Sequence, residues 1–392
     1  MEPRSLYLHI PFCQHRCAYC DFNTYSGQEA LIPAYVQALH TEIESLADNQ
    51  QLIHTVFFGG GTPSLLEPDQ IRKILESIRS NFDLDSAAEI TLEANPGTIS
   101  RPYLQELRGI GINRLSIGAQ SANPEELRVL ERTHSFEETI DAIKNARLAG
   151  FDNINLDLMF ALPGQTLDRW QRTLDLAIQL NPEHFSLYSL SFEHGTPFTA
   201  LNHRGLFAIP SQDLAAEMYQ MAQDKLQAQG FQHYEISNWA KESNNEQSYE
   251  CNHNLQYWKN QPYFGLGAGA HGWIDGQRTR NVLAPSAYIK RLSKNQDDLI
   301  HPRTAATFEC NPIDRRTEMA ETMMMGLRLL ENGISSSAFK TRFDTSLESI
   351  YGQQIESLLE KELVSWQVNG SNNLMLTPKG RNLGNQVFME FI

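Results

Sequence analysis

The sequence predicts an α/β protein whose amino-terminal part is a barrel of parallel strands that does not close. Short apolar runs alternate with amphipathic helical patterns over roughly the first 200 residues, which is the order of repeated βα units. Polar residues recur where these apolar runs end, and the alternation stops in the second half of the chain. Six units are many for a small open sheet and too few for a closed eight-unit barrel. We therefore expect a partial (β/α)6, TIM-like barrel, with a doubly wound sheet as the alternative.

The expected strands and helices of this barrel follow one another in a regular order. The strands cover residues 7–11, 54–58, 88–94, 114–119, 153–160 and 184–191. The helices cover residues 30–48, 103–110, 124–132, 136–149 and 167–179. Apolar residues recur at helical spacing in these segments, so each helix has a face that packs on the sheet. Right-handed crossovers then make the strands parallel.

After residue 200 the pattern changes. The expected elements are a long helix over 211–229 and a strand over 234–239. Residues 241–261 are polar and rich in asparagine, which favours a loop. A second glycine-rich loop, residues 265–272, indicates close backbone packing or, as the alternative, an anion-binding nest. Residues 293–314 contain two prolines and mixed charges, which predicts a linker to the last segment.

The C-terminal segment resembles a winged-helix domain of the α+β type. Its expected elements are helices over 318–330, 337–343 and 347–361, strands over 363–368 and 374–376, a turn over 369–373 and a last helix from residue 379. Such domains often bind DNA, but the acidic chain favours a protein-interaction or lid role. We expect Met323, Met324 and Met325 to fill its core, since haem ligation is a much rarer use of methionine. The predicted domains are therefore 1–230, 231–314 and 315–392.

Composition and charge exclude two classes of protein. The chain has 392 residues, 41% of them hydrophobic and 20% charged, as in an ordinary globular protein with a large core. Its net charge of −15 at pH 7 disfavours nucleic acid as a partner, because phosphate backbones are bound by clustered lysine and arginine. No apolar run approaches the roughly 18 residues that span a bilayer. The first strand also follows Met1 too closely for a cleavable leader, so we expect a cytoplasmic protein.

Three cysteines lie close together directly after the first expected strand. Cys13, Cys17 and Cys20 have no fourth cysteine nearby. Three thiolates can bind three irons of a 4Fe–4S cluster, which leaves the fourth iron open for a ligand. The alternatives are a zinc site with His15 as fourth ligand, although the spacing is poor for tetrahedral geometry, a disulfide, or inert buried thiols. An odd number of cysteines and no signal peptide disfavour the disulfide.

A triple glycine follows the second expected strand. Gly59, Gly60 and Gly61 precede Thr62 and Pro63. Glycine allows a close approach of the backbone to another group, or a positive φ, and a tight turn needs only one such residue. We therefore expect the backbone to come close to something at this point.

Polar residues also lie in or at the ends of three later strands. They are Glu93, Gln120 and Asp157. In a parallel barrel the carboxyl ends of the strands meet at one mouth, which also holds the cysteine loop and the triple glycine. We expect these side chains to converge on one site. The alternative is that each of them caps a helix or a turn.

The combination of CxxxCxxC with GGGTP after the next strand resembles the radical S-adenosylmethionine (radical SAM) family. This resemblance implies that Cys13, Cys17 and Cys20 hold a 4Fe–4S cluster and that SAM chelates its open iron. Within the family the chain resembles the HemW haem chaperones, relatives of oxygen-independent coproporphyrinogen III oxidase. The run CDFN at Cys20 to Asn23 is similar to the chaperone pattern. The oxidases carry a further cysteine where this chain has Phe22.

The resemblance implies two sets of binding residues. The implied SAM contacts are Tyr7, Tyr19, Gly60, Gly61, Thr62, Glu93, Gln120, Arg132 and Asp157. An HNxxY motif is matched by His253, Asn254 and Tyr257, which implies haem binding with His253 as an axial ligand.

The function implied is a haem chaperone that delivers haem to apoproteins. The alternative is a coproporphyrinogen III oxidase that decarboxylates propionate side chains by radical chemistry. Whether the chain is an enzyme stays open. The implied partners are haem, haem-accepting apoproteins and a one-electron donor. A homodimer and peripheral contact with membrane-bound acceptors are left open as well.

Overall fold

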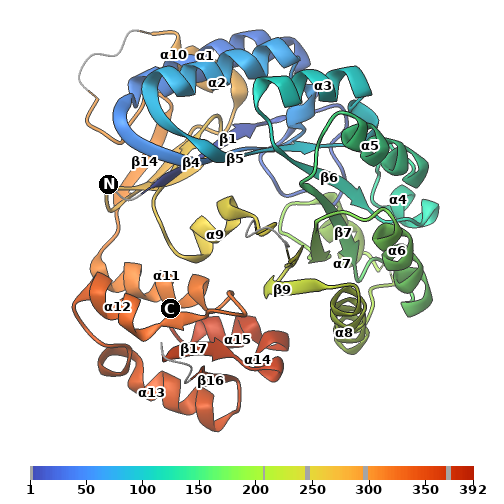
Figure 1. The fold of residues 1–392 in the computed structure, drawn as a ribbon, viewed down its shortest axis with the longest axis vertical. Coiled ribbons are helices and arrows are strands. Elements are labelled where there is room, and N and C mark those ends of the chain that lie inside the picture. Colours follow the sequence, from blue (N-terminus) through green and yellow to red (C-terminus); the bar gives the residue numbers. More distant parts are fainter. Residues whose placement is uncertain (1–2, 206–207, 243–247, 295–298, 368–371) are drawn as a thin grey trace.

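The computed structural model describes residues 3–205, 208–242, 248–294, 299–367 and 372–392. A large curved sheet with helices on its outer face forms most of the molecule, and a smaller C-terminal unit lies beside it (Figure 1). The strand order of the large sheet is β14-β13-β12-β11-β1-β4-β5-β6-β7-β8-β10-β9. No helix in these ranges is long and apolar enough to cross a membrane.

The central strands of the sheet are parallel, which confirms the predicted partial barrel. They are β1 (Arg4–Ile10), β4 (Asp48–Gly60), β5 (Phe82–Ala94), β6 (Arg114–Gln120), β7 (Ile154–Phe160) and β8 (His184–Ser189). The helices between them are α1 (Ile32–Ser45), α2 (Pro68–Asn81), α3 (Arg101–Ile110), α4 (Pro124–Val129), α5 (Phe136–Leu148) and α6 (Leu167–Gln179). They lie on the convex side of the sheet in Figure 1, so these strands are covered by helices there and face the barrel interior on the other side.

Helix α2 was not among the expected elements, although its sequence carries clear signals. Pro68 stands at the first helical position, and Glu67, directly before the helix, forms a capping box with Gln70 in its first turn. Ile71, Ile74, Leu75 and Ile78 are fully buried at helical spacing. The unit between β4 and β5 is therefore a regular βαβ crossover like the others.

The sheet extends beyond the parallel strands at both edges, which corrects two expectations. β9 (Phe231–Glu235) and β10 (Asn238–Lys241) are antiparallel neighbours, so the single strand expected over 234–239 is wrong. β11 (Tyr263–Leu266) pairs in parallel with β1, followed by β12 (His271–Ile274), β13 (Gln277–Asn281) and β14 (Thr307–Pro312). The linker expected over 293–314 is therefore wrong at its C-terminal end, because β14 is a strand at the edge of the sheet. It is mostly exposed and ends in proline, as edge strands often do.

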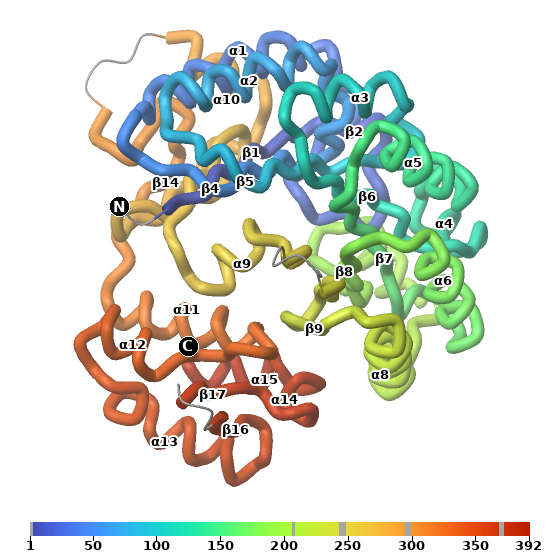
Figure 2. The backbone as a smooth tube through the Cα atoms, in the orientation of Figure 1, coloured from blue at the N-terminus to red at the C-terminus, as the bar shows by residue number. Residues whose placement is uncertain are grey.

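Four helices complete this part of the chain. They are α7 (Pro197–His203), α8 (Gln212–Ala228), α9 (Asn252–Trp258) and α10 (Pro285–Leu292). Helix α8 packs on α6, where the indole of Trp170 donates a hydrogen bond to the carbonyl of Met218 at 2.8 Å. Helix α9 replaces part of the loop expected over 241–261, of which residues 243–247 fall outside the described ranges. Figure 2 shows it on the inner side of the sheet, facing the C-terminal unit.

The second glycine-rich loop packs closely, as the sequence predicts, and it surrounds a carboxylate of the protein itself. A Cβ on Gly265 would overlap the carbonyl of His271. Glu42 of α1 is fully buried beneath the loop and accepts a hydrogen bond from the amide of Gly267 at 2.8 Å. Its other donors are Asn281 at 2.7 Å, Tyr288 at 2.6 Å and Thr304 at 2.9 Å. One carboxylate thus connects α1 with β13, α10 and the segment before β14.

The C-terminal unit has its own core and agrees with the winged-helix-like prediction. Its helices are α11 (Arg315–Gly326), α12 (Ser336–Phe343), α13 (Leu347–Glu360), α14 (Pro378–Asn382) and α15 (Gly384–Met389). Its strands are β15 (Ile334–Ser335), β16 (Val364–Gln367) and β17 (Asn373–Leu376), in the order β15-β17-β16. Most of the turn expected over 369–373 falls outside the described residues. The unit is joined to the turn that follows α9 by Arg342, which donates to the carbonyl of Asn260 at 2.8 Å.

Candidate functional site

The cysteine loop leaves the carboxyl end of β1 and is held against it by short strands. Cys13 ends β2 (Phe12–Cys13), which pairs with β3 (Tyr25–Ser26), while Cys17 and Cys20 lie on the loop between these strands. All five cysteines are free, so the disulfide alternative is wrong. Burial raises the pKa of Cys13 to about 11, and the thiols of Cys20 and Cys17 add to this effect. The three thiols therefore share one environment, in which bound metal would have to replace their protons.

Each thiol has a different neighbour. The hydroxyl of Thr62 lies 3.6 Å from the Cys13 sulfur, Arg132 Nη1 lies 3.9 Å from that of Cys17, and the Thr24 hydroxyl 3.8 Å from that of Cys20. His15, the ligand required by the zinc alternative, instead contacts Glu131 at 3.2 Å. In the part of the chain that the structure describes, no group of three or more histidine, cysteine or acidic side chains is placed so that it could hold a single metal ion. A donor set of three thiols, one for each iron, suits an iron–sulfur cluster.

The triple glycine brings its backbone against β1 and the cysteine loop. The amide of Gly61 donates to the carbonyl of Ile10 at 2.8 Å, and the amide of Thr62 donates to that of Phe12 at 2.8 Å. Gly60 has a φ of +111°, and a Cβ there would meet the ring of His9. A Cβ on Gly61 would lie 2.6 Å from the Phe12 carbonyl. The glycines therefore allow the contact that places Thr62 beside Cys13.

Glu93 and Asp157 lie together in the barrel interior. Glu93 accepts a hydrogen bond from the amide of Gly60 at 3.0 Å. Asp157 accepts hydrogen bonds from Ser116 at 3.1 Å and from Asn155 at 2.8 Å. Burial, together with the charge of Asp157, raises the pKa of Glu93 to about 8. Burial also raises the pKa of Asp157.

The raised pKa of Glu93 makes the stability of the protein depend on pH. The pKa of Glu93 is about 8 in the folded protein and 4.5 for an unperturbed side chain, so folding favours the protonated form. The resulting stabilisation is complete below pH 4.5 and is lost as the pH rises through 8. We expect the free energy of unfolding, measured with urea and no added SAM, to fall between pH 6 and pH 9. Glu93→Gln should reduce this fall without abolishing it, because burial raises the pKa of Glu235 to about 7 as well. If the free energy of unfolding fell equally in the wild type and in Glu93→Gln, the raised pKa could not be assigned to Glu93.

Arg132 and Gln120 lie on the same side of β6, close to the cysteine loop. One nitrogen of Arg132 donates to the side chain of Asn95 and, at 2.9 Å, to the carbonyl of Gly118. Arg132 Nε is buried and has no hydrogen-bond partner among the described residues. Gln120 ends β6 with a φ of +65°, a backbone conformation that non-glycine residues rarely adopt outside functional sites and turns. Tyr19, in the cysteine loop, also interacts with Arg132.

Tyr7 and His253 form a second group, deeper in the barrel. The hydroxyl of Tyr7 lies 3.0 Å from His9 Nδ1, and the rings of Tyr7 and His253 are 6.3 Å apart. His253 Nδ1 is hydrogen-bonded to Thr55 at 2.8 Å and its Nε2 to Tyr257 at 2.8 Å. The ring is 1% exposed, and burial lowers its pKa to about 3.

The HNxxY segment is therefore a buried helix and not a solvated loop. Tyr257 orients the ring of His253, whereas Asn254 is partly exposed. Ligation of iron by His253 requires one of its two hydrogen bonds to break.

Sequence reasoning missed two buried charges in the strands. Glu89 of β5 accepts hydrogen bonds from the amides of Asn252 and His253, both at 3.1 Å, and so holds the start of α9. Arg114 of β6 is 2% exposed and lies near Glu89 and Asp157. A charged residue within an otherwise apolar strand was the available signal, because such residues are rarely buried without a partner.

Comparison with known proteins gives matches along the whole chain. Residues 7–177 match the model of the radical SAM superfamily, and residues 313–383 match the HemN C-terminal domain. The heme chaperone HemW of Bacillus subtilis (strain 168) is 38% identical over 392 residues, 99% of this chain and 99% of that protein. That of Lactococcus lactis is 35% identical and covers 100% of this chain and 98% of its own length.

A solved structure matches the fold as well. Coproporphyrinogen III oxidase (HemN) from Escherichia coli has a TM-score of 0.81 and 23% identity, covering 99% of this chain and 90% of that one. At this level of identity the match concerns the fold alone.

Proposed function

Since the chain belongs to the HemW family of heme chaperones, within the radical SAM superfamily, we propose that it binds haem and delivers it to haem-accepting apoproteins. The observation that carries the proposal is the end-to-end match to relatives of that name, which includes both the cysteine loop and the C-terminal domain. The resemblance found in the sequence is thereby confirmed at the level of the family.

Membership of the radical SAM superfamily implies a 4Fe–4S cluster and SAM. We assign the cluster to Cys13, Cys17 and Cys20. When bound, it supplies one-electron chemistry toward SAM, with electrons from a separate donor protein. The protein itself would hold three of the four irons through the three cysteines. Thr62 donates a hydrogen bond to the Cys13 sulfur, and Arg132 lies beside Cys17.

The polar residues around the cysteine loop fit the charges of SAM. The unpartnered Nε of Arg132 suits the carboxylate of the methionine part. Glu93 and Asp157 place two carboxyl groups in a buried interior, which suits a ligand that carries an ammonium and a sulfonium. The remaining proposed SAM contacts are Tyr7, Tyr19, Gly60, Gly61, Thr62 and Gln120.

The proposed function is tested by two assays on the anaerobically reconstituted protein. Titration with haem should shift the Soret band. Incubation with coproporphyrinogen III, SAM and a reductant should yield no protoporphyrinogen, since Phe22, which is exposed, stands where the oxidases carry a cysteine. Formation of protoporphyrinogen would overturn the chaperone proposal in favour of the oxidase.

His253→Ala is expected to weaken haem binding by about tenfold, because it removes either an axial ligand or the group that positions Tyr257. Tyr257→Phe separates these two roles. It frees Nε2 of His253, so haem binding is retained if the histidine is a ligand and weakened if the tyrosine makes the contact. The readouts are the Soret titration, with iron content and thermal unfolding to show that each variant is intact. An unchanged titration in both variants would remove this motif from the haem site.

A further inference from the structure

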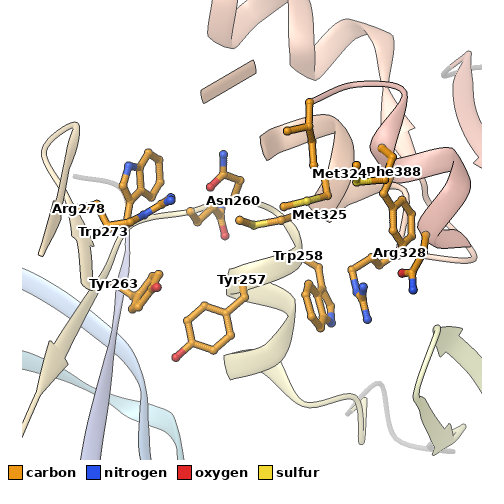
Figure 3. A pocket seen from close by; sticks show the side chains of 14 residues that line it. Tyr257, Trp258, Asn260, Tyr263, Trp273, Arg278, Met324, Met325, Arg328 and Phe388 are labelled. Atoms are coloured by element: carbon orange, nitrogen blue, oxygen red, sulfur yellow. The ribbon is translucent and has the colours of Figure 1, made fainter. Parts of the chain in front are cut away.

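A pocket of about 450 Å³ lies between the barrel and the C-terminal unit (Figure 3). This volume is within the roughly 300 to 1,000 Å³ that is typical of small-molecule sites. Its walls come from α9, from the β11–β13 corner and from α11 and α15 of the C-terminal unit. The apolar lining residues include Tyr257, Trp258, Tyr263, Trp273, Met324, Met325 and Phe388.

Three buried N–H groups of the pocket residues lack an acceptor. Arg328 Nε, Trp258 Nε1 and Trp273 Nε1 have no hydrogen-bond partner among the described residues. Trp273 is 5% exposed, so water satisfies this donor poorly. An apolar pocket with three unused donors is suited to a ligand that brings its own acceptors.

Arg328 is the charge available to such a ligand. Its guanidinium stacks on the rings of Trp258 at 4.5 Å and Phe388 at 5.5 Å. Burial lowers its pKa, whereas the charge of Glu235 acts in the opposite direction without a side-chain hydrogen bond between the two residues. Arg278, the other arginine of the pocket, differs because Glu321 binds both its terminal nitrogens at 2.6 and 2.7 Å.

The run of three methionines divides between the core and the pocket. Met323 is fully buried in the core of the C-terminal unit, as the sequence predicts. Met324 and Met325 are only partly buried and line the pocket, opposite Tyr257 and Trp258 in Figure 3. The expectation that all three are core filler therefore holds in part for Met324, which also packs against this core, and is wrong for Met325. Thioethers ligate haem iron in some proteins, and the aromatic walls suit a flat macrocycle.

We propose that this pocket is the haem seat, in which Arg328 binds a propionate and the iron takes a thioether of Met324 or Met325. The inference rests on the proposed function for the identity of the ligand. Tyr257 of the HNxxY motif forms part of the wall, so the motif contributes to the seat through this ring, with His253 as its positioning residue.

The experiment compares haem with iron-free protoporphyrin IX on the full-length protein. Arg328→Gln should lower the binding affinity for both ligands about tenfold, because both carry propionates. The double variant Met324→Leu, Met325→Leu should change the Soret and Raman spectra of bound haem and lower the affinity for haem. It should leave the affinity for protoporphyrin unchanged. Met323→Leu in the core and Arg315→Gln, exposed on the same helix, are matched controls that should bind both ligands normally.

A rim variant covers the case in which a pocket variant does not fold. Met389 is 67% exposed and lines the pocket. Met389→Trp therefore obstructs the pocket without a change in the core, and it should lower the binding affinity for both ligands. Haem binding by the wild type together with normal binding by all pocket variants would overturn the haem seat and leave the proposed function intact. A wild type that binds no haem would overturn both.

Discussion

Cys17→Ser is expected to abolish the iron–sulfur cluster. The variant, purified without oxygen, should lose its brown absorbance and nearly all of its iron and inorganic sulfide. Serine offers a harder, more basic ligand in place of a thiolate, and only two cysteines then remain on the loop. The loss should not unfold the protein, because the loop is held independently by the pairing of β2 with β3 and by the amides of Gly61 and Thr62.

Two other cysteines provide the controls for this variant. Cys310 lies on β14, where its thiol contacts Gln277 at 2.8 Å, and Cys251 is buried beside Glu89 at 3.6 Å. Both Cys310→Ser and Cys251→Ser should keep their iron and sulfide. Full iron and sulfide content in Cys17→Ser, or zinc in place of iron in the wild type, would contradict the assignment of the cluster.

Glu42→Ala is expected to lower the free energy of unfolding by about 4 kcal/mol, since each of four buried donors then loses its acceptor at roughly 1 kcal/mol or more. The donors are the amide of Gly267 and the side chains of Asn281, Tyr288 and Thr304. Urea unfolding followed by circular dichroism measures the change. Because these donors come from β13, α10 and their loops, this edge of the sheet should be affected first, which hydrogen exchange can show.

Two variants of the same helix sharpen this measurement. Glu42→Gln keeps the size of the side chain and one carbonyl acceptor, so it should lose only about half as much stability. Glu44→Ala changes an exposed residue two positions further along the same helix and should alter the free energy of unfolding by less than about 0.5 kcal/mol. A small effect for Glu42→Ala would mean that water replaces the carboxylate.

The parallel part of the fold could be predicted because its signals are local. Strands such as β6 and β7 are buried over almost their whole length and have an apolar side chain at every second position, and the helices between them carry a single apolar face. The two edges could not be predicted in the same way. β14 is short, mostly exposed and polar, and β9 and β10 are separated by a two-residue turn without glycine or proline.

The candidate site was predictable to a similar extent. The cysteine loop, the triple glycine and the carboxyl groups at the strand ends could be found from their order along the chain. The burial of His253 could not, because it depends on Glu89 and Thr55, which lie more than 150 residues away and hold α9 inside the barrel. The pocket was equally invisible, since its walls come from four segments that only the fold brings together.

The position of α9 decides how the two halves of the molecule can communicate. Its inner face contacts β4 through His253, while Tyr257 and Trp258 line the pocket on the side of the C-terminal unit. The ring of His253 lies 5.0 Å from that of Tyr257 and 4.9 Å from that of Phe57, and the ring of Tyr7 lies 6.3 Å from both His253 and Phe57. A haem in the proposed seat would therefore lie at one end of a run of aromatic rings that reaches Tyr7 of β1, the strand from which the cysteine loop leaves, and these rings would give electrons a tunnelling route through the protein.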